Sequence, residues 1–78
     1  MNNTRRKELA KAIELLAQAR DIIEQCKDEE QESFDNLPES FQYGERGEQM
    51  EGFIYTLENA YDTIDELEAE IEDEIINA

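Results

Sequence analysis

The sequence predicts an all-α protein built as an antiparallel helical hairpin. Apolar residues recur every three to four positions through two segments of roughly thirty residues each. The stretch 33–47, where these segments meet, holds the sole proline and two of the three glycines, and bases gather in the first segment while acids gather in the second. The length is sufficient for one small domain, 1–78. We expect a first arm over about 4–35, a turn over about 36–44 and a second arm over about 45–76.

The first arm has a candidate cap, Asn3 or Thr4, ahead of an apolar helix face. The members of that face are Leu9, Ala12, Ile13, Leu16, Ala19, Ile23 and Cys26. Because a thiol on such a face is commonly a buried structural group, we expect Cys26 to be buried. Arg20 and Lys27 fall near the predicted seam, where they are expected to set the register by pairing with acids of the other arm.

The turn is predicted from Pro38, which fixes its own φ and excludes the preceding residue from the α region. Asn36 and Glu39 have the spacing of a small capping box, which predicts a short helical turn around Pro38 that bridges the arms. Gly44 or Ser40 is then the candidate cap of the second arm.

The second arm keeps its helical spacing for about seven turns, without glycine or proline after Gly52. Its apolar stripe consists of Met50, Phe53, Ile54, Leu57, Ala60, Tyr61, Ile64, Leu67, Ile71 and Ile75. At about 1.5 Å per residue, the two arms are matched rods of about 45 Å. Matched rods joined by a short turn make an antiparallel hairpin.

Charge favours the same arrangement. Residues 1–27 carry a net charge of +2 and residues 28–78 one of −17. Each cluster lies at the unfavourable end of its own helix dipole, so an antiparallel pairing of the two relieves both penalties. The expected pairing is between Arg5, Arg6, Lys7 and Lys11 and the acidic tail, Glu68, Glu70, Glu72, Asp73 and Glu74.

The apolar stripes are wider than the single seam of two helices requires. We therefore expect the hairpin to dimerise into a four-helix bundle. The candidates for the second contact are Leu15, Ile22, Phe53 and Ala60.

The most distinctive predicted surface is an acidic face on the second arm, opposite its apolar stripe. Placed at 100° intervals, its members are Glu51, Tyr55, Glu58, Asp62, Asp65, Glu66 and Asp73. Residues three or four apart on one helix are about 5 to 6 Å apart, so the carboxylates form a ladder. No base lies between Glu48 and Ala78 to compensate them. The alternatives are a solvated helix face and a surface that imitates the phosphates of a nucleic acid.

Composition argues against direct binding of nucleic acid or anionic membranes, against catalysis and against metal binding. The net charge of −15 repels nucleic acid and anionic membranes and favours basic partners. There is no histidine, and we expect no enzyme activity, cofactor or metal site. Three pairs of carboxylates, Glu45 and Glu48, Glu48 and Glu51, and Glu70 and Asp73, have spacings like those of helical magnesium-dependent nucleotide pyrophosphohydrolases. In that family the pairs lie on facing helices, whereas here all three fall on one arm. No transmembrane run or signal peptide is evident, which predicts an intracellular soluble protein.

Several runs in and around the turn carry a resemblance. They are Asp28-Glu29-Glu30-Gln31, then Phe34-Asp35-Asn36-Leu37-Pro38-Glu39-Ser40, Glu45-Arg46-Gly47 and Met50-Glu51. Together they resemble a family of short, acidic, uncharacterised proteins encoded by bacteriophages and prophages. The resemblance implies a helical hairpin of viral origin that acts in the bacterial cytoplasm. It implies no activity and no functional residue.

These observations lead to two functional hypotheses for a non-enzymatic binding protein. In the first, the acidic face imitates nucleic acid and blocks the basic groove of a host DNA-acting or defence enzyme. In the second, the chain is an assembly module that docks to a partner through the turn aromatics Phe41 and Tyr43.

Overall fold

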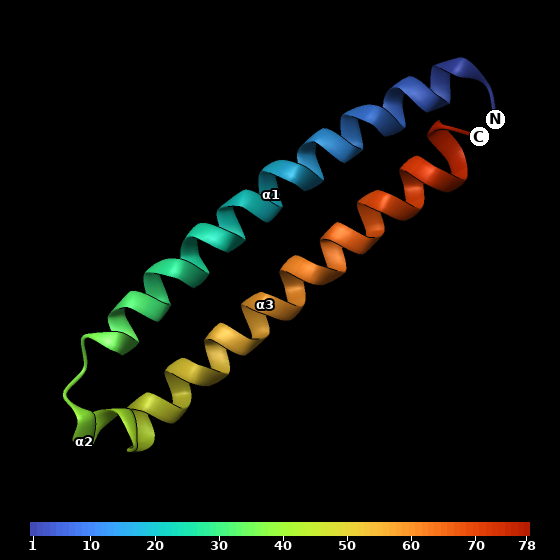
Figure 1. Ribbon diagram of the computed structural model, residues 1–78. Helices are drawn as coiled ribbons and strands as arrows, with labels where there is room; N and C mark the ends of the chain where they lie inside the picture. Colours follow the sequence, from blue (N-terminus) through green and yellow to red (C-terminus); the bar gives the residue numbers. More distant parts are fainter.

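The computed structural model describes all residues, 1–78, and contains helices and short connections but no strand. Two long helices, α1 (Asn3–Asp35) and α3 (Glu45–Ile71), are joined through a single helical turn, α2 (Glu39–Gln42). A π-helical turn, η1 (Glu72–Ile76), ends the chain. The long helices run antiparallel, so both termini lie at one end and α2 at the other (Figure 1). The rod measures 58 × 16 × 13 Å, and the all-α class with paired long helices is confirmed.

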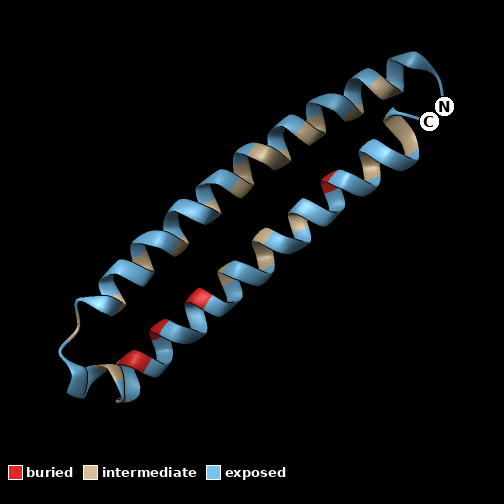
Figure 2. Cartoon of the chain, in the orientation of Figure 1, coloured by how far each residue is buried: buried red, intermediate tan, exposed pale blue.

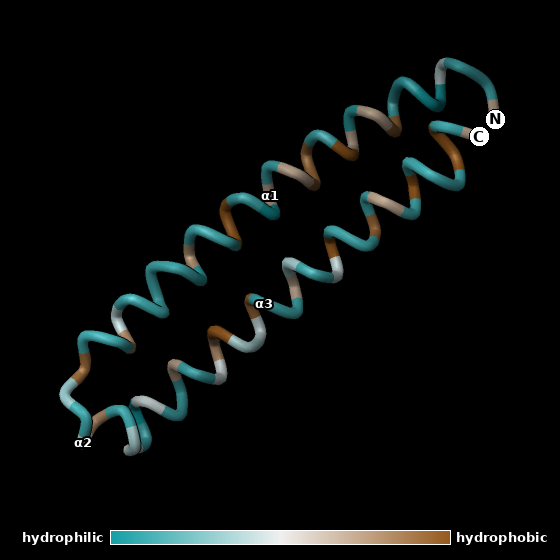
Figure 3. The backbone as a smooth tube through the Cα atoms, in the orientation of Figure 1, coloured by the Kyte–Doolittle hydropathy of each residue, from teal (hydrophilic) through white to brown (hydrophobic).

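The helices meet along a narrow seam, whose residues alternate at spacings of three and four (Figure 2). In α1 the half-buried seam residues are Leu9, Ile13, Leu16, Arg20, Ile23, Lys27, Glu30 and Phe34. From α3 and η1 the buried and half-buried seam residues are Gly47, Met50, Ile54, Leu57, Tyr61, Ile64, Glu68, Ile71 and Ile75. A repeat of 3.5 residues is the spacing that keeps two helices in continuous contact. Figure 3 shows the hydrophobic residues along these facing edges.

The seam corrects part of the predicted apolar faces. Cys26 is exposed rather than buried, because Lys27 takes the seam position beside it. Leu67 and Phe53 are also exposed, since Glu68 and Ile54 occupy the seam instead. In a pair of helices, each helix buries only about one residue in every 3.5 against its partner. Residues at the edges of a wider apolar stripe therefore stay exposed to solvent.

Both ends of α1 differ from the predicted caps. Asn2, rather than Asn3 or Thr4, is the N-cap, and its Oδ1 accepts a 2.8 Å hydrogen bond from the backbone N–H of Arg5. The predicted capping box of Asn36 and Glu39 does not form. Asn36 has φ −86° and ψ −6° and closes the last turn of α1, so its side chain does not cap α2. Gly44, one of the two predicted candidates, is the N-cap of α3.

The turn is fixed by Gln42 and Gly47. The Gln42 side-chain amide donates to the carbonyl oxygens of Phe34 (3.2 Å), Leu37 (3.1 Å) and, more weakly, Asp35 (3.5 Å). Phe34 and Asp35 are the last residues of α1 and Leu37 follows it, so the amide binds carbonyls at a helix end, where intrahelical donors run out. Gly47 then passes so close to the Gln42 backbone that an added Cβ would lie 2.0 Å from the Gln42 carbonyl oxygen. The turn therefore needs a long amide at 42 and no side chain at 47.

The predicted pairing of the basic start with the acidic tail is not seen as ion pairs. The N- and C-terminal segments lie at the same end of the rod (Figure 1), and α1 contacts η1. However, Lys11 pairs with Glu8 of its own helix at 3.1 Å, and Arg5, Arg6 and Lys7 form no ion pair. All these acidic-tail side chains except Glu68 are exposed.

Candidate protein-binding surfaces

The predicted acidic face lies exposed along α3. Glu51, Glu58, Asp62 and Glu66 are all exposed, and none of them forms an ion pair. With a rise of about 1.5 Å per residue, Glu58, Asp62 and Glu66 follow one another at about 6 Å along the axis. Tyr55, which is 66% exposed, stands among them. α3 thus presents unpaired carboxylates and one aromatic ring on a rigid helix.

Two members of the predicted face have different surroundings. Asp65 is exposed, but its Oδ1 accepts a 2.6 Å hydrogen bond from Arg20 Nη1 of α1. Asp73 lies in η1, where the wider π-helical turn changes the direction of successive side chains relative to α3. Asp65 therefore contributes to joining the two helices, and Asp73 does not continue the α3 ladder in phase.

Arg20 is the centre of a polar cluster inside the seam. Its Nε lies 3.5 Å from Oε1 of Glu68, which is only 8% exposed, and its Cζ lies 5.6 Å from the centroid of the Tyr61 ring. Burial lowers the pKa of Arg20, but the charge of Glu68 and the hydrogen bond to Asp65 outweigh burial and raise that pKa above its ordinary value. Arg20 is thus the predicted cross-arm cation. Lys27 instead pairs with its neighbour Asp28 at 3.8 Å.

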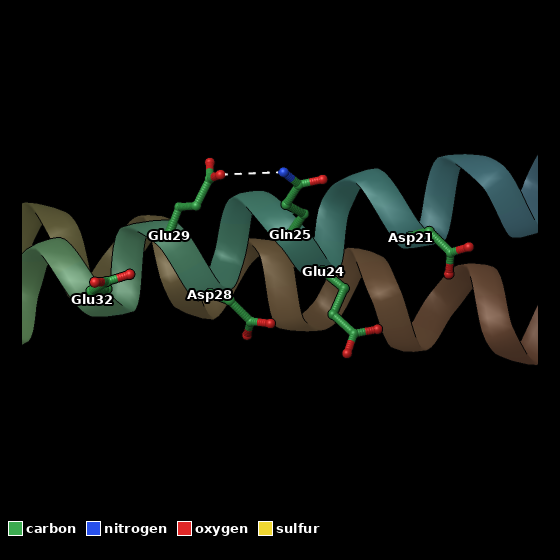
Figure 4. A pocket seen from close by; sticks show the side chains of 6 residues that line it. All are labelled: Asp21, Glu24, Gln25, Asp28, Glu29 and Glu32. Carbon is green, nitrogen blue, oxygen red and sulfur yellow. Dashed lines mark hydrogen bonds between the residues drawn. The ribbon is translucent and has the colours of Figure 1, made fainter.

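A second acidic cluster, which was not predicted from the sequence, lies on α1. Carboxylates and one amide line a shallow, open depression there, formed by Asp21, Glu24, Gln25, Asp28, Glu29 and Glu32. Figure 4 shows Gln25 and Glu29 on one edge of the helix, joined by a 3.3 Å hydrogen bond, and Asp21, Glu24 and Asp28 directed to the other edge. The signal was present in the spacing of these acids at three and four residues, which the stronger charge bias of the second arm obscured.

Part of the α1 cluster, namely Asp21, Glu24 and Asp28, shares one broad side of the hairpin with the acids of α3. Two antiparallel helices are related by a two-fold axis perpendicular to the plane that contains both helix axes. Residues that directly follow the seam residues in one helix therefore lie on the same side of the hairpin as those that directly follow the seam residues in the other. Glu24 directly follows the seam residue Ile23, and Glu51, Glu58 and Asp65 likewise follow seam residues of α3. We call the side that carries Glu24, Glu51, Glu58 and Asp65 the acidic side.

The turn aromatics form a separate exposed surface. Phe41 in α2 is 55% exposed, and Tyr43, which follows α2, is 78% exposed. Both lie at the end of the rod away from the termini. Neither ring is packed into the seam, so both are accessible to a partner.

Other kinds of site receive no geometric support. No three cysteine, aspartate or glutamate side chains converge into a potential metal site. The carboxylate pair Glu45 and Glu48 lies at the start of α3, whereas Glu70 and Asp73 lie at the opposite end of the rod. No helix has an apolar stretch long enough to span a bilayer.

Comparisons with protein-family models, with curated proteins and with solved structures found no match for this chain. Its function is therefore inferred from the acidic side, the seam and the exposed turn.

Proposed function

We propose that this chain is a non-enzymatic, acidic protein-binding module of phage origin. In this proposal it acts in the bacterial cytoplasm and imitates nucleic acid, blocking the basic groove of a host DNA-acting or defence enzyme. The observation that carries the proposal is the row of exposed, unpaired carboxylates on α3, at Glu51, Glu58, Asp62 and Glu66. The resemblance of the turn region to phage and prophage proteins supports the proposed origin.

The charge density of the rod supports imitation of a nucleic acid. A net charge of −15 over a length of 58 Å amounts to one negative charge per about 4 Å. One strand of B-DNA carries one per 3.4 Å of helix axis. A groove lined with lysine and arginine that binds a phosphate strand would therefore meet a similar linear density of negative charge on this hairpin.

The basic residues of this chain leave the acidic row free for a partner. Arg20 is engaged by Asp65 and Glu68, Lys11 by Glu8, and Lys27 by Asp28. Like charges at helical spacing destabilise a helix when nothing compensates them. A basic partner would supply that compensation, and Tyr55 would contribute an aromatic contact of the kind enriched in interface hot spots.

The test is capture of host proteins from a bacterial lysate by the immobilised full chain at low and at high salt. The charge-reversal variant is Glu58→Lys/Asp62→Lys/Glu66→Lys, which leaves out Asp65 because it also holds Arg20. We expect DNA-binding proteins to be retained at low salt, released at high salt and lost with the variant, because screening weakens exposed charge pairs. Retention that is indifferent to salt, or bound proteins that do not bind nucleic acid, would contradict the proposal.

A second candidate function is an assembly module that docks through its turn. It is favoured by the exposure of Tyr43 and Phe41 at the tip of the rod. The Phe41→Ala/Tyr43→Ala variant is the matched comparison for the charge-reversal variant. The assembly function predicts that only the turn variant loses its partner, and the nucleic-acid imitation predicts that only the charge-reversal variant does.

We also propose that the hairpin acts as a homodimer, a four-helix bundle made of two copies. The support is the thin core of one copy, in which Met50 and Ile54 are the only buried hydrophobic residues. Small domains bury a modest fraction of their surface, and association with a second copy is one way in which they gain stability.

A further inference from the structure

We infer that a second copy of this chain packs on the side of the hairpin opposite the acidic side. This inference names the surface of the proposed homodimer and rests on that proposal. It is independent of which partner, if any, the acidic side binds. We call this surface the apolar side and define it by Leu15, Ala19 and Ile22 of α1 and Phe53, Ala60 and Leu67 of α3.

The position of the apolar side follows from the seam. Ala19 directly precedes the seam residue Arg20, and Phe53, Ala60 and Leu67 directly precede seam residues of α3. These residues therefore lie on the flank opposite the residues that follow the seam, which carry Glu51, Glu58 and Asp65. Leu15 lies four residues before Ala19 and Ile22 three residues after it, so all three lie on the same face of α1. Leu15 and Ile22 lie farther from the seam than Ala19 does.

Large apolar side chains on this side are left in solvent. Leu15 is 65% exposed, Ile22 62% and Phe53 51%. Between them on α3, the hydroxyls of Thr56 and Thr63 donate to the carbonyl oxygens of Gly52 at 3.0 Å and Asn59 at 2.8 Å. Because these hydroxyls bond to their own helix, the threonines require no polar partner on this side.

One copy exposes more surface than a compact monomer of its mass, and the excess is similar to the area that a dimer interface would cover on each copy. The hairpin exposes 5874 Å². A compact monomer of 9.1 kDa would expose about 4,900 Å². The excess of about 1,000 Å² is close to the roughly 800 Å² that each partner contributes to a standard-sized interface.

Charge and shape select a second copy as the occupant. Two chains of net charge −15 repel each other, so their least unfavourable approach is through the flank that directly precedes the seam, which carries no charged residue between 12 and 26 of α1 or between 49 and 67 of α3. Large residues alternate with Ala19 and Ala60 along both helices, which gives a twofold-related copy small positions to receive large side chains. In such a four-helix bundle the two acidic sides face outward, in opposite directions, and both remain available to a partner.

The experiment is sedimentation equilibrium of the full chain in about 0.5 M NaCl, where charge repulsion is screened. We expect the wild type to have twice the mass of the 9.1 kDa chain. The test variant is Leu15→Ala/Ile22→Ala, which removes only exposed side chains and introduces the residue with the best helix propensity. We expect this variant to keep its helical circular dichroism and to raise the dimer dissociation constant at least tenfold.

The matched control is Tyr55→Ala, which removes an exposed aromatic residue outside the apolar side and is expected to leave the dimer unchanged. A wild type that is monomeric at about 100 μM would overturn the inference. A dimer that withstands the double alanine variant, or that weakens equally with Tyr55→Ala, would overturn it as well. Capture of lysate proteins by the double alanine variant tests partner binding by the acidic side separately from dimerisation. Failure of the proposed dimer surface therefore does not imply failure of the proposed nucleic-acid imitation, or the reverse.

Discussion

Arg20 of α1 and Glu68 of α3 face each other across the seam, with Nε of the guanidinium 3.5 Å from Oε1 of the carboxylate. Both take positions that apolar residues occupy elsewhere along the seam, and Glu68 is the only charged residue that is buried. A buried carboxylate is tolerated where a cation compensates it. The pair forms in only one register of the two helices. Removing only one of the two charges should therefore lower stability, whereas removing both should not.

Removing only the cation is expected to destabilise the hairpin. Arg20→Met leaves Glu68 buried without a positive partner, so we expect the melting temperature to fall by roughly 5 °C or more. Arg20→Met/Glu68→Leu removes both charges and should restore the melting temperature or exceed the wild-type value. The control is Lys11→Met, which breaks the exposed pair with Glu8 and should change the melting temperature by about 2 °C at most. Equal effects of Arg20→Met and Lys11→Met in thermal circular dichroism would contradict the assigned role.

A pH dependence follows from the raised pKa of Arg20. A cation whose pKa is higher in the folded state stabilises the fold fully below its unfolded pKa, and this stabilisation is lost as pH rises through the folded pKa. For arginine that loss lies beyond the usable pH range. Arg20→Lys brings the transition down toward the ordinary lysine pKa of about 10.4. We expect the melting temperature of Arg20→Lys to fall further below the wild-type value between about pH 9 and 11, whereas a constant difference would argue against the ion pair.

The two glycines of α3 should respond oppositely to alanine. In Gly47→Ala the new Cβ meets the Gln42 carbonyl oxygen at 2.0 Å, so the turn must shift, at a cost of about 1–3 kcal/mol. In Gly52→Ala the new Cβ meets nothing within 4 Å, and the gain in helix propensity should stabilise the protein by about 0.5–1 kcal/mol. Urea unfolding of both variants measures these changes. A stabilised Gly47→Ala variant would show that α2 does not approach α3 as described.

Gln42 is expected to be sensitive to a change of a single atom. Gln42→Glu keeps the shape of the side chain but replaces the donating amide by a carboxylate. That carboxylate would face the carbonyl oxygens of Phe34 and Leu37 at the negative end of α1. We expect a loss of about 1–3 kcal/mol in the free energy of unfolding. Gln49→Glu adds the same charge to an exposed position of α3 and serves as the control. Equal losses in the two variants would point to general charge repulsion instead of the lost hydrogen bonds.

The helical class and the pairing of two long helices followed from local information. Apolar spacing, Pro38 and Gly44 of the turn are features of short stretches of sequence, and helix formation depends on such neighbours. Gly44 was one of two candidate caps, and Arg20 one of two candidate cross-arm cations, of which Lys27 pairs within its own helix instead. The acids at Glu51, Glu58, Asp62 and Glu66 were expected on an exposed face, and they lie exposed.

Which residue of each adjacent pair enters the seam was decided by the partner helix. Cys26 and Lys27, or Leu67 and Glu68, differ by only 100° around a helix, and the apolar member was the natural prediction. A straight helix has 3.6 residues per turn, whereas continuous contact with a partner selects a repeat of 3.5, so a stripe read from one helix drifts by about 20° per heptad. The tertiary pairing fixed the repeat, placed Arg20 opposite Glu68, and left Cys26 and Leu67 in solvent.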